Sequence, residues 1–200
     1  MAKLLILGDS TVDNGLYVDD GEPDVPQQIA EHLPGWVIDQ RAVDGHTCAD
    51  VLENLPAVYD ADAIFLSCGG NDALGHQSRL ADPEPRPFAE VLVTLRAIRE
   101  AFRAPYVKLL DALPDCKVLV ATIYNPNYED PQAFLQAPAE GGLSIFNDVI
   151  LSEAVARKMA VVDLRRLMAA PGDYANAIEP NASGGGKIAK AVAEWAAASV

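Results

Sequence analysis

Four short groups of polar and glycine residues carry the side chains in this sequence that are suited to chemistry. The first ends the run Leu4-Leu5-Ile6-Leu7-Gly8-Asp9-Ser10, an apolar strand pattern followed by a glycine turn that presents a hydroxyl. The others are Asp44-Gly45-His46, Gly69-Gly70-Asn71-Asp72 and Asn176-Ala177-Ile178-Glu179. Gly, Asn and Asp are ordinary turn residues, so each group alone is weak evidence. Together they combine a hydroxyl with carboxylates, amides and an imidazole, which are the components of nucleophilic catalysis.

A serine hydroxyl at the turn after a strand is exposed for attack on a carbonyl carbon. Such an attack forms a covalent acyl-enzyme and splits one difficult step into two easier ones. The serine needs a base to accept its proton, and Glu179, His46 and His76 are the candidates near the four groups. His32 falls in a predicted helix away from them. The alternative interpretation of Ser10 is an ordinary turn or helix-capping serine.

Five short apolar runs, alternating with helical patterns, predict the elements that position these groups. The runs are Lys3–Leu7, Trp36–Gln40, Ala63–Ser67, Lys117–Thr122 and Ala160–Asp163. Continuous apolar runs are typical of strands that are covered on both faces. The amphipathic segments are Val25–Leu33, Cys48–Leu55, Phe88–Leu113 with an interruption at Pro105, Leu143–Lys158, and Gly186–Ala198. This alternation predicts a parallel sheet between two helical layers, in a single domain over residues 1–200.

The four polar groups follow the first, second, third and fifth predicted strands. Ligands of open α/β sheets bind at the carboxyl ends of the strands, so we expect the groups to meet on one rim. Two proline-rich loops are also predicted, over Ala81–Pro87 and Asn125–Pro138. The second is long for a plain connection, which makes it a candidate substrate-facing loop. The aromatic residues Tyr124, just before this loop, and Tyr128 and Phe134 within it are candidates for the wall of a pocket.

The ordered set of groups resembles the SGNH hydrolases, the GDSL family of esterases, lipases, thioesterases and carbohydrate deacetylases. Gly8-Asp9-Ser10 matches the nucleophile block, Gly45 the lone-glycine block, and Gly69-Gly70-Asn71-Asp72 the Gly-x-Asn-Asp block. The resemblance runs from Leu4 to about Ala189. It implies a flavodoxin-like three-layer α/β/α sandwich with a five-stranded parallel sheet.

The resemblance also implies an activity, the cleavage of a carboxylic ester through an acyl-enzyme on Ser10. The backbone N–H groups of Ser10 and Gly45 and the side-chain amide of Asn71 would then form the oxyanion hole. We expect Asp72 to be a structural residue. No metal or organic cofactor is implied, and the expected partner is a small-molecule ester.

The chain departs from the family pattern at the base. Pro180 and Ile188-Ala189 match the residues that follow the family's histidine, which places Glu179 at the histidine and Asn176 at the aspartate of Asp-x-x-His. A rival register over Asp173–Asn176 keeps an aspartate but supplies no histidine.

We expect Glu179 to be the base, with a pKa raised by burial from about 4.3 to about 6 or 7. We expect the amide of Asn176 to donate to its carboxylate. His46 and His76 are the alternative bases. The alternative function is a catalytically silent protein that binds a small ester or carbohydrate, and a third is an acyltransferase that uses the same serine.

Composition narrows the partners. The 15 basic and 29 acidic residues give a net charge of −14, which disfavours binding to nucleic acid or to anionic membranes. The three cysteines fit structural thiols in a reducing compartment. The sequence has no leader-like start and no apolar run of the roughly 18 residues that a membrane span requires, so we expect a cytoplasmic protein. The Gly184-Gly185-Gly186-Lys187 run predicts a flexible entry to the last helix.

Overall fold

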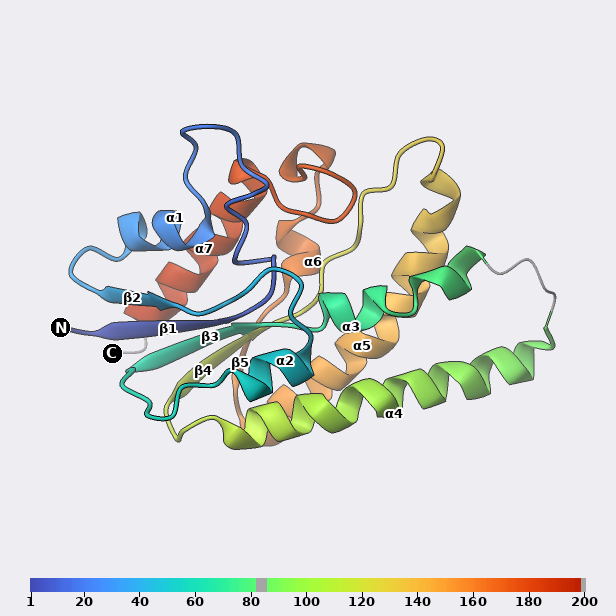
Figure 1. Cartoon of the computed structure of the whole chain (residues 1–200), viewed down its shortest axis with the longest axis horizontal. Coiled ribbons are helices and arrows are strands. Elements are labelled where there is room, and N and C mark those ends of the chain that lie inside the picture. The colour runs from blue at the N-terminus through green and yellow to red at the C-terminus, as the bar shows by residue number, and fades with distance from the viewer. Residues whose placement is uncertain (82–85, 199–200) are drawn as a thin grey trace.

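The computed structural model describes residues 1–81 and 86–198 and is built on one parallel β-sheet (Figure 1). Its strand order is β2-β1-β3-β4-β5, the flavodoxin-like order. The strands are β1 (Lys3–Gly8), β2 (Val37–Gln40), β3 (Ala63–Ser67), β4 (Lys117–Ala121) and β5 (Ala160–Val162). The predicted three-layer α/β/α fold with five parallel strands is confirmed.

Helices cover both faces of the sheet (Figure 1). One face carries α1 (Val25–His32), α6 (Leu164–Leu167) and α7 (Ala182–Ala197). The other carries α2 (Cys48–Glu53), α3 (Gly70–Leu74), α4 (Phe88–Ala112) and α5 (Gln136–Arg157). Three 3₁₀ turns complete the described elements: η1 (Gln77–Ala81), η2 (Ala133–Leu135) and η3 (Pro171–Asp173). Because strand side chains alternate, Leu4 and Ile6 pack on the first face while Leu5 and Leu7 pack on the second.

Two helices differ from the prediction at a proline and at a glycine run. Helix α4 continues through Pro105, since a stripe of buried residues on either side, including Phe102 and Tyr106, holds it against the sheet. Helix α7 begins at Ala182, so the three glycines lie inside it rather than before it. A Cβ on Gly184 would lie 2.2 Å from the carbonyl oxygen of Asp173, which explains why this position has no side chain.

Helix α5 begins at Gln136, seven residues before the predicted Leu143. Pro138, Gly141 and Gly142 obscure the helical pattern of this first part. The predicted loop over 125–138 is correspondingly shorter and includes η2. Residues 82–85 of the other predicted loop lie outside the described part of the chain.

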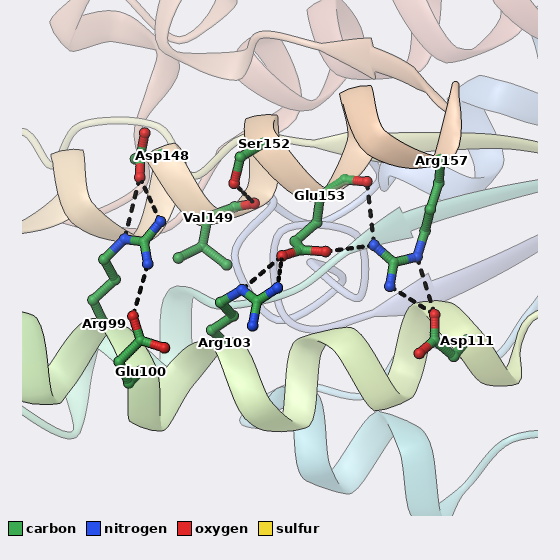
Figure 2. A network of polar contacts seen from close by, with 9 residues as sticks. All are labelled: Arg99, Glu100, Arg103, Asp111, Asp148, Val149, Ser152, Glu153 and Arg157. Atoms are coloured by element: carbon green, nitrogen blue, oxygen red, sulfur yellow. Dashed lines mark hydrogen bonds and ion pairs between the residues drawn. The ribbon is translucent and has the colours of Figure 1, made fainter.

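The C-terminal halves of α4 and α5 are joined by ion pairs, which we call the α4–α5 clamp (Figure 2). Glu153 of α5 is the central residue, with Arg103 Nη2 2.6 Å from Oε1 and Arg157 Nη1 2.5 Å from Oε2. Arg157 also pairs with Asp111 at 2.6 Å, and Arg99 of α4 pairs with Asp148 of α5 at 2.9 Å. The clamp fixes the two helices to each other on the sheet face that also carries α2 and α3.

Candidate active site

The side chains of Ser10 and Glu179 meet although 169 residues separate them in sequence. Ser10 Oγ donates a hydrogen bond to Glu179 Oε1 at 3.2 Å. Both residues are buried, with exposed fractions of 8% and 7%. The fold therefore brings the first and fourth polar groups of the sequence into direct contact.

Ser10 lies on a tight turn at the end of β1. Gly8 makes this turn with φ +147°, and a Cβ there would lie 1.9 Å from the carbonyl oxygen of Ser67, so no other residue fits. The Asp9 carboxylate accepts a hydrogen bond from Thr11 N at 3.1 Å, and the Asp9 carbonyl accepts one from Val12 N at 3.1 Å. These bonds fix the backbone on both sides of the hydroxyl.

Glu179 is held by the backbone of its own loop. Asn176 Oδ1 accepts hydrogen bonds from Ile178 N at 2.9 Å and Glu179 N at 3.0 Å. The buried Tyr124 hydroxyl donates to the Ile178 carbonyl at 2.6 Å. Asn176 therefore differs from the expectation that its amide donates to the carboxylate. Its short side chain instead caps nearby N–H groups, as Asn does in turns, and so orients the backbone that carries Glu179.

Burial raises the pKa of Glu179 from 4.5 to about 7. The negative charges of Asp44 and Asp9 add to this effect, while the hydrogen bond from Ser10 opposes it. Its second oxygen, Oε2, is buried and has no hydrogen-bond partner among the described residues. A carboxyl group in these conditions exchanges its proton near neutral pH, as a general base must.

Asp9 is a second buried carboxyl group beside the nucleophile. It is 2% exposed, and burial raises its pKa from 3.8 to about 6, with a further contribution from Asp72. Hydrogen bonds with Thr11 oppose the rise. The site therefore has two carboxyl groups whose pKa values lie well above the usual range.

The expected oxyanion donors come from three loops. Ser10 and Asn71 line the same cavity, whereas Gly45 is not among its lining residues. Gly45 has φ +84°, a conformation that favours glycine. Asn71 Nδ2 donates to the His46 carbonyl at 3.1 Å, which ties the second loop to the third.

Asp72 accepts a hydrogen bond from Cys48 N at 2.9 Å, which anchors the start of α2. This contact agrees with the structural role expected for Asp72. The Sγ atoms of the buried Cys48 and Cys68 are 2.9 Å apart. These two cysteines and the half-buried Cys116 are all free thiols.

Within the described residues, none of the three histidines has a hydrogen bond with the Ser10 side chain. The one hydrogen bond that the Ser10 side chain makes within the described part of the chain goes to Glu179. His76 lines the cavity, with its ring 6.5 Å from that of Phe146, whereas His46 contributes its carbonyl group to Asn71. His32 is exposed on α1.

Sequence reasoning missed Tyr17 and Asp13, which form hydrogen bonds with Asp44, a negative charge that acts on Glu179. Tyr17 donates to Asp44 Oδ2 at 2.8 Å, and Asp13 accepts from Asp44 N at 2.9 Å. The hydrogen bond from Tyr17 to Asp44, burial and the negative charge of Glu179 raise the pKa of Tyr17 to about 12. Tyr17 and Asp13 lie in the loop after β1, where no spacing distinguishes them from other loop residues.

A cavity of about 600 Å³ opens at the Ser10–Glu179 contact and continues between α4 and α5. Tyr124 and Tyr128 line it, as expected from the sequence. Phe134 is not a lining residue and is 67% exposed. Within residues 1–81 and 86–198, no cluster of three or more His, Cys, Asp or Glu residues is placed to hold a metal ion, and no helix is long and apolar enough to cross a membrane. The cytoplasmic location stays a prediction.

Solved structures with the same fold are enzymes that act on several kinds of ester. A lipase from a goat rumen metagenome is 18% identical, with a TM-score of 0.73 over 98% of this chain and 97% of that one. An extracellular lipase from Streptomyces rimosus is 18% identical, with a TM-score of 0.70 over 100% of both chains. A carbohydrate acetylesterase from Sinorhizobium meliloti is 16% identical, with a TM-score of 0.67 over 99% of both.

A search of curated proteins gave no significant match. The sequence profile of one family, however, matches residues 6–185. This match contains all four polar groups, the end of β1 and the other four strands. The chain belongs to the GDSL-like lipase/acylhydrolase family.

Proposed function

We propose that the protein hydrolyses carboxylic esters with Ser10 as nucleophile and Glu179 as general base. The observation that carries the proposal is the 3.2 Å hydrogen bond from Ser10 Oγ to Glu179 Oε1. Membership of the GDSL-like family supports ester hydrolysis as the reaction class. The proposed partner is a small-molecule ester.

The reaction runs in two halves. In the first, Ser10 Oγ attacks the ester carbonyl carbon while its proton passes to ionised Glu179. The protonated Glu179 then gives this proton to the departing alcohol, which leaves an acyl-enzyme. In the second half, Glu179 takes a proton from a water molecule that attacks the acyl carbon. The carboxylic acid leaves, and the proton returns to Ser10 Oγ.

The raised pKa of Glu179 compensates for the weak basicity of an ordinary carboxylate. An increase from 4.5 to about 7 brings Glu179 to the range of a catalytic histidine. At about 1.4 kcal/mol per pKa unit, the environment recovers about 3 kcal/mol of driving force for proton transfer. Among the described residues, no donor meets the buried Oε2, so none stabilises the ionised form at that oxygen.

We assign the oxyanion hole to the backbone N–H groups of Ser10 and Gly45 and to the side-chain amide of Asn71. An Asn amide has two N–H donors, and one of them is engaged by the His46 carbonyl. The other is free to meet the developing oxyanion. Asn176 acts as a positioning residue through the backbone of Ile178 and Glu179.

A fluorophosphonate probe tests the nucleophile and the base together, because it labels only a serine with an activated hydroxyl. We expect wild-type protein to be labelled at Ser10 at pH 8, and both Ser10→Ala and Glu179→Gln to lose labelling while remaining folded by circular dichroism. The matched controls are His46→Ala and His76→Ala, which we expect to be labelled at Ser10.

Full labelling of Glu179→Gln would reject the glutamate base. Loss of labelling in one histidine variant alone would assign the base to that histidine. Wild-type protein that stays unlabelled from pH 6 to pH 9 would favour the silent binding protein. Product analysis with an added alcohol separates hydrolysis from acyl transfer, since a transferase would form a new ester in preference to the free acid.

A further inference from the structure

The cavity extends well beyond the catalytic residues, into a channel between the N-terminal halves of α4 and α5. The α4–α5 clamp joins α4 and α5 from Arg99 and Asp148 onward (Figure 2). The cavity-lining residues of the two helices, by contrast, fall within Phe88–Ile98 and Pro138–Phe146. Ion pairs therefore fix the two helices to each other at one end, and the helices line an open space at the other. We call this space between the N-terminal halves the α4–α5 channel.

The walls of the channel are apolar. Helix α4 contributes Phe88, Val91, Leu92, Leu95 and Ile98, and helix α5 contributes mainly small and aliphatic residues together with Phe146. Among the described lining residues of these two helices, Thr94 is the one polar side chain. Arg79 and Arg86 line the cavity from the segment before α4. A long apolar wall that begins at a nucleophile is suited to a hydrocarbon chain, since burying a hydrocarbon in it is favourable.

Two glycines in α5 increase the space in this channel. Gly141 and Gly142 lie inside the helix, where glycine is the poorest helix former after proline. Packing does not require glycine at either position, because an added Cβ would meet no atom within 4 Å. Neither glycine has a positive φ. Both line the cavity. The protein thus accepts a weaker helix at two cavity-lining positions where an added Cβ would meet open space.

We propose that the α4–α5 channel binds the acyl part of the ester as an unbranched chain of six or more carbons, and that Gly141, Gly142 and Leu95 set its maximum length. This inference rests on the proposed ester hydrolysis. The family alone does not decide the acyl group, because structures of the same fold include both lipases and a carbohydrate acetylesterase. The acyl carbon lies at Ser10, and the chain extends away from Glu179 along α4 and α5.

A series of p-nitrophenyl esters from acetate to dodecanoate, below their critical micelle concentrations, tests the length dependence. Each buried methylene contributes about 0.8 kcal/mol, so kcat/KM should rise about fourfold per methylene until the channel is full. The increase from acetate to hexanoate should be roughly two orders of magnitude. Equal rates across the series, or a maximum at acetate, would overturn the inference and leave ester hydrolysis intact.

Variants locate the chain. Leu95→Trp and Gly142→Leu each place bulk in the channel, so the best substrate should become shorter and the octanoate-to-acetate ratio of kcat/KM should fall. Two control variants introduce side chains of the same size at positions that do not line the channel. Val93→Trp lies on α4 and is 69% exposed, and Ala137→Leu lies at an exposed position of α5. Both should keep the wild-type profile. Unchanged profiles in Leu95→Trp and Gly142→Leu would place the acyl chain elsewhere.

A binding measurement separates this inference from the proposed function. In Ser10→Ala, titration calorimetry should detect methyl octanoate, with the negative heat-capacity change that apolar burial produces. Methyl acetate should give no detectable binding, and Gly142→Leu in the same background should abolish the octanoate signal. If no ester is hydrolysed but these results hold, ester hydrolysis fails and the channel stands. If methyl octanoate does not bind, the channel assignment fails.

Discussion

Two glutamates of this protein have the same low solvent exposure and yet have pKa values shifted in opposite directions. Glu153 in the α4–α5 clamp and Glu179 beside Ser10 are each 7% exposed. For Glu153, burial acts to raise the pKa, but Arg157 and Arg103 outweigh it and the pKa is lowered. For Glu179, burial dominates and the pKa rises to about 7.

The two glutamates differ in their charged partners. Glu153 has two guanidinium groups within 2.6 Å of its oxygens. Glu179 takes part in none of the ion pairs of the described residues, and its neighbouring charges, Asp44 and Asp9, are negative. A buried carboxylate with cations is a structural ion pair, whereas one without them binds a proton at neutral pH. The placement of arginines therefore decides which glutamate is available for proton transfer.

The largest expected effect is on catalysis. Glu179→Gln should lower kcat/KM for a p-nitrophenyl ester by roughly 10³-fold or more, since a general base contributes about 10²–10⁴-fold and Glu179 is the one base that hydrogen-bonds to Ser10 among the described residues. Glu153→Gln should keep kcat/KM close to wild type when assayed where circular dichroism shows it folded. Equal losses in the two variants would remove the distinction between the two glutamates.

The pH profile should report the titration of Glu179. Only the ionised form accepts the serine proton, so kcat/KM should rise with pH and level off above a midpoint of about 7. Between pH 7 and pH 5, activity should fall by roughly 50-fold, as a single titrating group requires. A midpoint near 4.5 in a stopped assay would contradict the raised pKa, because it would mean that burial has no effect.

The stability of Glu179→Gln should depend on pH in a direction that follows from the raised pKa. The folded protein holds the Glu179 proton up to about pH 7, whereas the unfolded chain releases it near 4.5. The contribution of Glu179 to the free energy of unfolding should therefore fall as pH rises from 4.5 to 7. The free energy of unfolding of Glu179→Gln minus that of wild type, measured by urea unfolding, should be about 2–3 kcal/mol larger at pH 8 than at pH 4. No gain at pH 8 would show that the ionised carboxylate carries no cost.

Glu153→Gln should act in the opposite sense. Removing the charge leaves Arg103 and Arg157 without their shared partner, which costs about 3–5 kcal/mol for a fully buried pair. Because Arg103 is 43% exposed, water replaces part of the interaction, and we expect a loss of about 2 kcal/mol at pH 8. Urea unfolding of Glu153→Gln and Glu179→Gln at pH 8 measures the two opposite changes in the free energy of unfolding. A stabilised Glu153→Gln would mean that the clamp costs more than it contributes.

The smallest effect concerns the glycines of α5. Gly141→Ala should raise the free energy of unfolding by about 0.5–1 kcal/mol, because alanine favours the helix and the added Cβ meets no atom within 4 Å. Gly184→Ala in α7 is the contrasting variant, since its Cβ would lie 2.2 Å from the Asp173 carbonyl oxygen, and it should be destabilised. Thermal unfolding of both variants checks the pair. A destabilised Gly141→Ala would indicate that packing requires that glycine.

Much of the fold could be predicted because its signals are local. Each strand is an apolar run, so Ala63–Ser67 was predicted at its observed bounds and the other strands to within one residue at either end. Helix boundaries were less accurate where local signals conflict with packing. Pro105 disfavours a helix, yet the burial of its neighbours maintains α4. The glycines of α5 and α7 give no helical signal in the sequence, because they are set by the close contact at Gly184 and by the open space at Gly141 and Gly142.

The sequence by itself determined the parallel sheet, the four polar groups on its rim and the family, because strand patterns and ordered motifs are properties of neighbouring residues. It also identified Glu179 as the residue at the position of the missing histidine. Only the tertiary structure placed that carboxyl group against Ser10, buried it among negative charges and separated it from the arginines of the clamp. A pKa depends on desolvation and on charges brought together from distant parts of the chain, and these exist only after folding.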